Sequence, residues 1–199
     1  MFQNCTGLAT ITISESISSI KSRTFSGCSE LTSIIIPDSV TSIGYRVFQN
    51  CTGLTSVTIP DSVTSIGDSV FYNCTALTTV TIPYAVTDIG LAVFKNCTSL
   101  SSIIIPESIL SIGSFAFYGC SGLTTISIPG SVQFIEIEAF SGCSSLTTMY
   151  IDSMTAPILS REVFNDVSNL TLHIQSESTG YGVVPWIDTS IFTVIIKDL

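Results

Sequence analysis

The sequence predicts a solenoid, an elongated stack of similar coils with a parallel sheet of short strands, one strand from each 23-residue coil. Three series of residues predict it, because cysteine, leucine and phenylalanine each recur every 23 residues. The series are Cys5, Cys28, Cys51, Cys74, Cys97, Cys120 and Cys143; Leu8, Leu31, Leu54, Leu77, Leu100, Leu123 and Leu146; and Phe2, Phe25, Phe48, Phe71, Phe94, Phe117 and Phe140. A strict period of this length is typical of solenoids, since one repeat cannot bury its apolar face alone and stacks on its neighbours.

Each coil is expected to begin with a short strand. In the third unit, the run Ser56, Val57, Thr58 and Ile59 alternates polar and apolar side chains, which is typical of a half-buried strand. Stacked copies of this run form a parallel sheet with strands about 4.7 to 4.9 Å apart. Pro60 ends the strand, because proline has no N–H group to continue the hydrogen-bond ladder.

The second half of each coil is expected to turn. Val63 and Ile66 form a second apolar pair, and Gly67, which follows them, allows a positive φ or a close backbone approach. The segment DSVFYN, residues 68–73, is expected to form one turn of helix. An Asn or Gly stands directly before each cysteine, and these residues suit a left-handed conformation after such a turn.

The repeat predicts one solenoid over residues 1–174 and a C-terminal capping segment over residues 175–199. The solenoid begins in the middle of a repeat, because residues 2–8 are identical to residues 48–54. Since a solenoid needs a polar cap at each end, we expect that the N-terminal cap is missing and that an export signal was lost upstream of Met1. The uncapped end would allow end-to-end association.

The last quarter of the chain departs from the repeat. Asp152 replaces the proline, and the cysteine position is lost after Phe164. The tail contains Tyr181 and the only tryptophan, Trp186. We expect this aromatic bulk to close the apolar core.

Composition excludes several classes of partner. The formal net charge is -9 with only six lysines and arginines, so no basic surface is available for nucleic acid or anionic lipid. The apolar runs are too short to cross a bilayer, and we expect no membrane insertion. Charged residues make up 11% of the chain, so Ser, Thr and Asn must coat much of the surface.

The residues that carry chemistry elsewhere are sparse in this sequence. It has no Cys-x-x-Cys pair, one histidine, and no Gly-x-Ser-x-Gly motif, so we expect no metal site, no cofactor and no catalytic residues. Stacked cysteines would keep their Cβ atoms about 4.8 Å apart, beyond the usual disulfide separation of about 3.5 to 4.5 Å. The cysteines are therefore expected to form a ladder of reduced, buried thiols.

The outward row of the predicted sheet is the candidate ligand-binding surface. Side chains alternate along a strand, so the residue between two core positions must face outward. This row consists of Thr12, Ile35, Thr58, Thr81, Ile104, Ser127, Tyr150 and His173. Its apolar members are either anchors for a protein partner or residues that merely favour a sheet.

Two further patterns have competing interpretations. Glu15, Asp38, Asp61 and Glu107 follow the proline position and form either a solvated turn edge or, less favoured, a cation site. Asn-x-Thr sequences, such as Asn50-Cys51-Thr52, match the N-glycosylation motif. However, Asn alternates with Gly at that position, which favours a backbone requirement.

The unit LxxhxIPxxVxxIGxxxFxxC, in which h is apolar, resembles the BspA-like class of leucine-rich repeats. The resemblance covers residues 2 to 151 in register and extends more loosely to residue 199. It implies a leucine-rich-repeat solenoid, a right-handed superhelix of the α/β type that is mostly β with short helical turns. It also implies a cell-surface or secreted protein that adheres to host matrix proteins or to other cells, and it carries over no catalytic residues.

These observations predict a non-enzymatic interaction module that binds a protein or glycan ligand along the exposed sheet face. The first alternative is a structural spacer or stalk without a ligand of its own. A remote alternative is an ice-binding solenoid, because Thr-x-Thr strands such as Thr79 to Thr81 can order water, although Ile35, Ile104 and Tyr150 interrupt the row.

Overall fold

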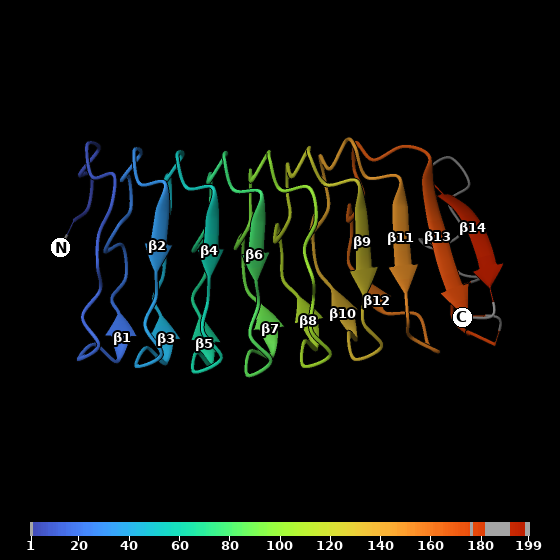
Figure 1. Cartoon of the computed structure of the whole chain (residues 1–199). Helices are drawn as coiled ribbons and strands as arrows, with labels where there is room; N and C mark the ends of the chain where they lie inside the picture. The colour runs from blue at the N-terminus through green and yellow to red at the C-terminus, as the bar shows by residue number, and fades with distance from the viewer. Residues whose placement is uncertain (1, 176, 182–191, 198–199) are drawn as a thin grey trace.

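The protein is an elongated stack of coils in which the first and last strands lie at opposite ends (Figure 1). The structure, a computed structural model, describes residues 2–175, 177–181 and 192–197, and describes only the backbone of residues 192–197. All strand pairs among the described residues are parallel. The predicted solenoid is confirmed.

One side of the stack carries the predicted sheet, and nearly every coil contributes a strand to it. The strands are β2 (Ser33–Ile35), β4 (Ser56–Thr58), β6 (Thr79–Thr81), β9 (Thr125–Ile128), β11 (Thr148–Ile151), β13 (Leu170–Gln175) and β14 (Phe192–Lys197). Single bridges from Thr12 to Ile35 and from Thr81 to Ile104 extend the same register to coils without a full strand. Each of these pairs from β2 to β13 joins residues one repeat apart, as Val57 to Val80 illustrates.

A second side of the stack carries a ladder of very short parallel strands. The strands are β1 (Ser19–Ile20), β3 (Ser42–Ile43), β5 (Ser65–Ile66), β7 (Asp88–Ile89), β8 (Ser111–Ile112), β10 (Phe134–Ile135) and β12 (Ile158–Leu159). In β3, Ile43 points into the core and is 1% exposed. The sequence indicated only an apolar pair here, because two residues are too few to show the alternation of a strand.

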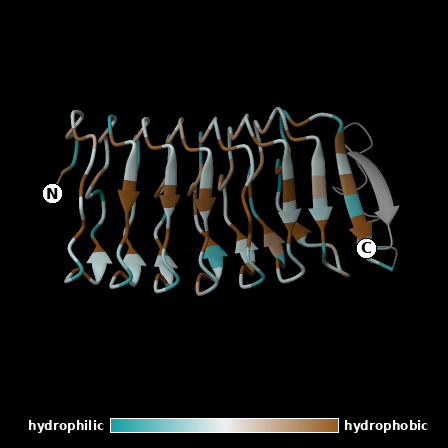
Figure 2. Ribbon diagram, in the orientation of Figure 1, coloured by the Kyte–Doolittle hydropathy of each residue, from teal (hydrophilic) through white to brown (hydrophobic). Residues whose placement is uncertain are grey.

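Identical residues from successive coils lie over one another in the core. Leu54, Leu77 and Leu100 are fully buried. The phenylalanines stack face to face from Phe2 to Phe164, with centroids of successive rings 5.2 to 5.9 Å apart. Figure 2 shows apolar segments at the same level in successive strands of the sheet. Because each ring contacts a ring in both neighbouring coils, the core is one continuous body rather than a set of separate units.

The third side of each coil consists of turns and not of a turn of helix. In the second complete coil, Gln49 N–H donates to Arg46 O at 3.3 Å and Cys51 N–H donates to Phe48 O at 3.0 Å, so both bonds span three residues. Arg46 has a φ of 55°, which a continuous right-handed helix does not allow. No helix occurs among the described residues. The backbone instead bonds between coils, as when Phe48 N–H donates to Val70 O at 2.9 Å.

Left-handed residues occur at the predicted position before each cysteine, where Asn73 has a φ of 60° and Gly119 a φ of 69°. A second left-handed position in each coil was not predicted, because it is filled by residues as different as Arg46, Ala92 and Phe115. Residues such as Arg46, Ala92 and Phe115 each cost about 1 to 2 kcal/mol in this conformation, and the hydrogen bonds between coils offset this cost.

The glycine after the second apolar pair, which Lys21 and Glu136 replace in their own units, serves close approach rather than a positive φ. A Cβ atom built on Gly67 would lie 2.7 Å from the backbone nitrogen of Tyr45 in the preceding coil. At that separation a side chain would force the neighbouring backbone to shift, so Gly67 allows its coil to stack closely on the preceding one.

The cysteines form the predicted ladder of thiols. All seven are free, and six of them are fully buried while Cys5 is exposed. Each buried thiol donates to a phenylalanine carbonyl in the preceding coil, as from Cys51 Sγ to Phe25 O at 3.1 Å. Each of the six buried thiols therefore has a hydrogen-bond partner.

The last coil keeps the core pattern despite its divergent sequence. Val167 takes the cysteine position, since its N–H donates to Phe164 O at 3.1 Å and its side chain is 5% exposed. One extra residue shifts the second ladder, where Phe134 pairs with Ile158. Of the predicted capping segment, residues 176, 182–191 and 198–199 lie outside the described residues, Trp186 among them.

Candidate ligand-binding face

The predicted outward row lies on the face of the sheet that the core does not use. Pairing aligns Ile35 with Thr58, Thr58 with Thr81, and Thr81 with Ile104, one coil at each step. On the adjoining strands Ser127 aligns with Tyr150, and Tyr150 with His173. Strand alternation buries the residues between them, such as Val57 at 3% exposure.

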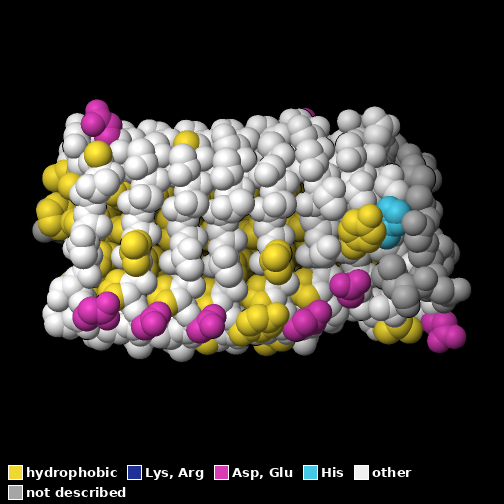
Figure 3. Space-filling view, in the orientation of Figure 1, with side chains coloured by type: hydrophobic (Ala, Val, Ile, Leu, Met, Phe, Trp, Pro, Cys, Tyr) yellow, Lys and Arg dark blue, Asp and Glu magenta, His cyan; other side chains and the backbone are white. Residues whose placement is uncertain are grey.

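Two isoleucines project from this face. Ile35 is 82% exposed and Ile104 is 80% exposed, while Thr12, Thr58, Thr81 and Ser127 are also exposed. Figure 3 shows isolated hydrophobic side chains on a surface formed mostly by hydroxyl groups and backbone. An aliphatic side chain this exposed contributes no packing to the fold and is available to a partner.

The hydroxyl groups near the sheet divide into two kinds. Those of Thr55 and Thr78 donate to backbone carbonyls in the preceding coil, both at 3.1 Å, and so stabilise the stack. Those of Thr58, Thr81 and Ser127 have no hydrogen-bond partner among the described residues and are available to a ligand.

His173 corrects the prediction of an exposed row along the whole sheet. It lies in the row, but only 8% of it is exposed, and its ring stacks on Tyr150 with centroids 4.6 Å apart. Strand β14 continues the sheet beyond it, with Ile195 in register. His173 Nδ1 is buried and has no hydrogen-bond partner in the part of the chain that the structure describes. The accessible row therefore ends at the half-buried Tyr150.

An acidic strip runs along one edge of the same face (Figure 3). We define it as Glu15, Asp38, Asp61 and Glu107, which are all exposed and follow the proline position of the repeat, a position that Ser14 holds in the first coil. Tyr84 takes this position in the coil between Asp61 and Glu107 and is 73% exposed. The strip carries one carboxylate per coil over the first three coils.

Basic side chains lie elsewhere. The five lysines and arginines within residues 2–175 are on the third side of the coils or at its beginning: Lys21, Arg23, Arg46, Lys95 and Arg161. Arg46 Cζ lies 4.6 Å from the ring centroid of Tyr45, and Lys95 Nζ lies 4.3 Å from that of Tyr118. Figure 3 shows acidic but no basic side chains of the described residues on the sheet face.

The family is decided by comparison with known repeats. The model of the BspA type leucine rich repeat region matches residues 1–103 and 87–193, with six copies. The chain belongs to this BspA-type family. It is therefore a leucine-rich-repeat protein, and members of this class are interaction or structural modules. No curated protein sequence matches it.

Two solved structures of leucine-rich-repeat proteins resemble this BspA-type solenoid. The T. pallidum leucine rich repeat protein is 28% identical with a TM-score of 0.77, over 81% of this chain and 78% of that one. A leucine rich cell surface protein from Faecalibacterium prausnitzii is 32% identical with a TM-score of 0.61, over 72% of this chain. This chain spans 48% of the F. prausnitzii protein, about half of its length.

A second exposed apolar cluster of the BspA-type solenoid was missed from the sequence. Phe134, Ile158 and Met154 are 45%, 63% and 46% exposed, and they line a groove of about 560 Å³ beside β10 and β12. In β3, β5 and β8 the position of Phe134 holds serine. This departure from the repeat at an outward position was the available signal.

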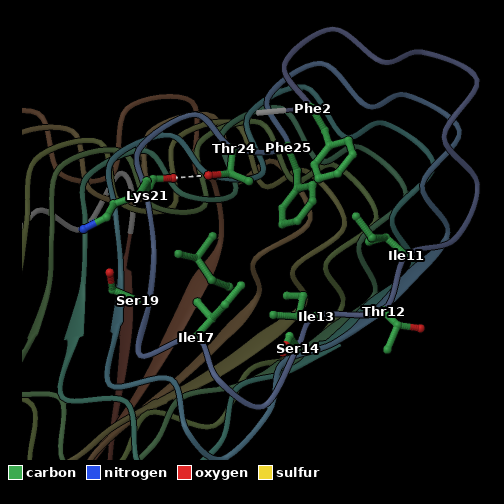
Figure 4. A pocket seen from close by; sticks show the side chains of 11 residues that line it. Phe2, Ile11, Thr12, Ile13, Ser14, Ile17, Ser19, Lys21, Thr24 and Phe25 are labelled. Atoms are coloured by element: carbon green, nitrogen blue, oxygen red, sulfur yellow. Dashed lines mark hydrogen bonds between the residues drawn. The ribbon is translucent and has the colours of Figure 1, made fainter.

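The first described coil leaves part of the apolar core accessible. A pocket of about 350 Å³ is lined by Phe2, Phe25, Ile11, Ile13 and Ile17, among others. Figure 4 shows the two phenylalanine rings side by side at its edge. Phe2 is 41% exposed, whereas the equivalent Phe48 is fully buried.

The other candidate features contribute no second site. Among the described residues, no three His, Cys, Asp or Glu side chains are grouped so that they could hold a metal ion. In the same part of the chain, no helix is suited to crossing a bilayer. Asn73 Nδ2 donates to Asn50 Oδ1 at 3.0 Å, and both residues have a φ of 60°. These asparagines thus serve the backbone, as the alternation with glycine predicts.

Proposed function

We propose that this chain is a non-enzymatic binding module of a cell-surface or secreted protein, and that its sheet face binds a protein or glycan ligand in adhesion. The observation that carries the proposal is the exposure of Ile35 and Ile104 on a face where the hydroxyl groups of Thr58, Thr81 and Ser127 have no hydrogen-bond partner among the described residues. Apolar anchors surrounded by polar groups are typical of protein-binding surfaces.

Family membership supports the non-enzymatic part of the proposal. The conserved positions of the repeat unit, such as Leu54 and Phe71, are fully buried and perform structural roles. The F. prausnitzii relative is described as a cell surface protein, which supports a location outside the cell.

Two other functions compete with this proposal. A spacer would need no exposed apolar side chain on the sheet, so Ile35 and Ile104 favour a ligand over a passive stalk. An ice-binding face would need uninterrupted threonine pairs, and a thermal-hysteresis assay tests it directly. End-to-end association through the pocket of the first coil stays a prediction.

The proposal is tested with the double variant Ile35→Ser and Ile104→Ser. We expect binding to arrayed extracellular-matrix proteins and glycans to weaken about tenfold or more, because loss of an interface hot spot costs at least about 2 kcal/mol. Both side chains are more than three-quarters exposed, so the urea midpoint should not fall. The matched control is Phe134→Ser and Ile158→Ser, which removes apolar surface from the second ladder.

Three results would count against the proposal. If the variant at Ile35 and Ile104 binds as the wild type does while the variant at Phe134 and Ile158 loses binding, the site lies in the groove beside β10 and β12. Equal binding by wild type and both variants would exclude both apolar surfaces. Absence of any binding across the array would favour the spacer.

A further inference from the structure

The chemistry of a partner for the sheet face can be narrowed by the charges beside it. The face presents Ile35 and Ile104 next to the acidic strip, and Figure 3 shows the strip and the sheet surface on the same side of the molecule. A partner that covers the isoleucines therefore also meets the strip.

The carboxylates of the acidic strip have no structural role among the described residues. None of them accepts a hydrogen bond or forms an ion pair there. Other acidic residues of the chain do: Asp68 Oδ1 accepts from Leu91 N–H at 3.0 Å, and Glu136 Oε2 accepts from Ser114 Oγ at 2.9 Å. Glu15, Asp38 and Asp61 thus place like charges one coil apart, about 4.8 Å at each step, and Glu107 follows two coils after Asp61, so repulsion between them destabilises the fold slightly.

The one residue that interrupts the strip before Glu107 also suits a cation. Tyr84 is 73% exposed, and the face of an aromatic ring attracts ammonium and guanidinium groups. Within the protein, Arg46 and Lys95 already lie over tyrosine rings, at 4.6 Å from Tyr45 and 4.3 Å from Tyr118. All five members of this edge therefore favour positive charge.

The spacing of the isoleucines fits an extended polypeptide. Ile35 and Ile104 are three strand steps apart, which corresponds to about 14 Å along the stack. Residues i and i+4 of an extended chain lie about 13 Å apart and point to the same side. The residue i+2 points to the same side, and a long side chain there can extend toward the strip, which each isoleucine precedes by only three residues, as Ile35 precedes Asp38.

We propose that the partner of the sheet face is an extended, cationic polypeptide segment. Its aliphatic side chains pack on Ile35 and Ile104, and its lysine or arginine side chains bind the acidic strip and Tyr84. This inference rests on the proposed function and deepens it, because it selects a basic polypeptide over a glycan.

The test is selection of random twelve-residue peptides displayed on phage against the intact chain. A twelve-residue peptide reaches about 40 Å when extended, enough to span both isoleucines and the strip. Selected peptides should combine aliphatic residues with a net positive charge. Each is then synthesised with a fluorophore, and its Kd is measured by fluorescence anisotropy at two salt concentrations.

Two variants of equal net charge test the role of the strip. In the triple variant Asp38→Asn, Asp61→Asn and Glu107→Gln, affinity should fall about tenfold, since each exposed charge pair contributes about 0.2 to 1 kcal/mol. The control Glu30→Gln, Glu162→Gln and Glu177→Gln removes three other exposed carboxylates and should stay within about twofold of wild type. Higher salt should weaken binding to wild type more than to the triple variant.

The outcomes separate this inference from the function on which it rests. Two results would overturn the cationic partner and leave the sheet face as the site. In the first, the selected peptides depend on Ile35 and Ile104 but carry no positive charge. In the second, their Kd for the triple variant equals that for the wild type. Equal loss in the control variant would show a general charge effect and would also overturn it. Absence of any peptide that depends on the two isoleucines would also overturn the cationic polypeptide, and the array measurement with Ile35→Ser and Ile104→Ser would then decide the proposed function separately.

Discussion

At the residue scale, burial controls the chemistry of the thiol ladder. Removal from water raises the pKa of Cys51 and of Cys143 to about 12, and raises those of Cys74 and Cys97 well above 9.0. A thiolate is the reactive form of cysteine. The inner thiols are therefore inert small hydrophobic groups at neutral pH.

The raised pKa values predict that stability falls at alkaline pH. In the unfolded chain a thiol with an ordinary pKa of 9.0 loses its proton before the folded chain does. The contribution of the thiols to the free energy of unfolding should thus be constant from pH 7 to about 8, fall progressively with rising pH, and approach a slope of about 1.4 kcal/mol per pH unit for each fully buried thiol above about pH 10. Urea denaturation under reducing conditions measures this dependence.

The double variant Cys74→Ala and Cys97→Ala isolates the thiols from other groups. Its free energy of unfolding should depend less steeply on pH above 9, because two of the contributing groups are absent. Equal slopes for the variant and the wild type would contradict a role for the buried thiols. Comparison at pH 7 measures the separate packing cost of the substitutions.

At the element scale, the stacked phenylalanines join the coils into one core. Phe71 lies between Phe48 and Phe94, with ring centroids 5.5 Å away on both sides. Aromatic pairs in contact contribute about 0.5 to 1.5 kcal/mol beyond burial of their surface. An interior ring thus stabilises two interfaces, whereas Phe2, in the first described coil, packs on one ring.

This difference predicts unequal costs for the same substitution. Phe71→Ala should lower the free energy of unfolding by about 3 to 5 kcal/mol, because it leaves a cavity between two coils. Phe2→Ala should cost less than about 1.5 kcal/mol, since Phe2 is already 41% exposed. Urea denaturation followed by circular dichroism compares the two, and similar losses would argue against the continuous stack.

The sequence predicted the elements whose side chains pack in the core, because the core accepts only apolar residues at those positions. Leu54 and Phe71 were assigned to interior columns because only apolar residues fit there. The second ladder and the left-handed Phe115 were not predicted, since backbone hydrogen bonds between coils determine them and place no demand on the side chain. Exposed Ile35 followed from strand alternation. The burial of His173 did not, because it depends on a neighbouring ring and on the end of the sheet.

At the scale of the whole molecule, the last strand matters for the exposed edge of the sheet. β14 pairs with β13 over six residues in parallel register. Without β14, β13 would be an edge strand and would present free N–H and C=O groups to other chains. β13 is the longest strand besides β14 and contains the buried Leu170, Leu172 and Ile174.

Removal of β14 should therefore destabilise the protein and cause self-association. A truncation that deletes residues 192–199 should lower the urea midpoint and increase the mass measured by light scattering. Deletion of residues 198–199 alone leaves β14 whole and is the matched control. A truncated chain that stays monomeric and equally stable would show that β13 needs no strand beside it.

The constant register between coils has a consequence for the length of the binding face. The coils that contain β2, β4 and β6 pair with one another through equivalent repeat positions. Insertion or deletion of one whole coil would therefore leave two compatible surfaces in contact. The geometry therefore permits growth by duplication of the coding segment for one coil. The length of the binding face would then change by one strand spacing for each added or lost coil, and the core residues would stay the same.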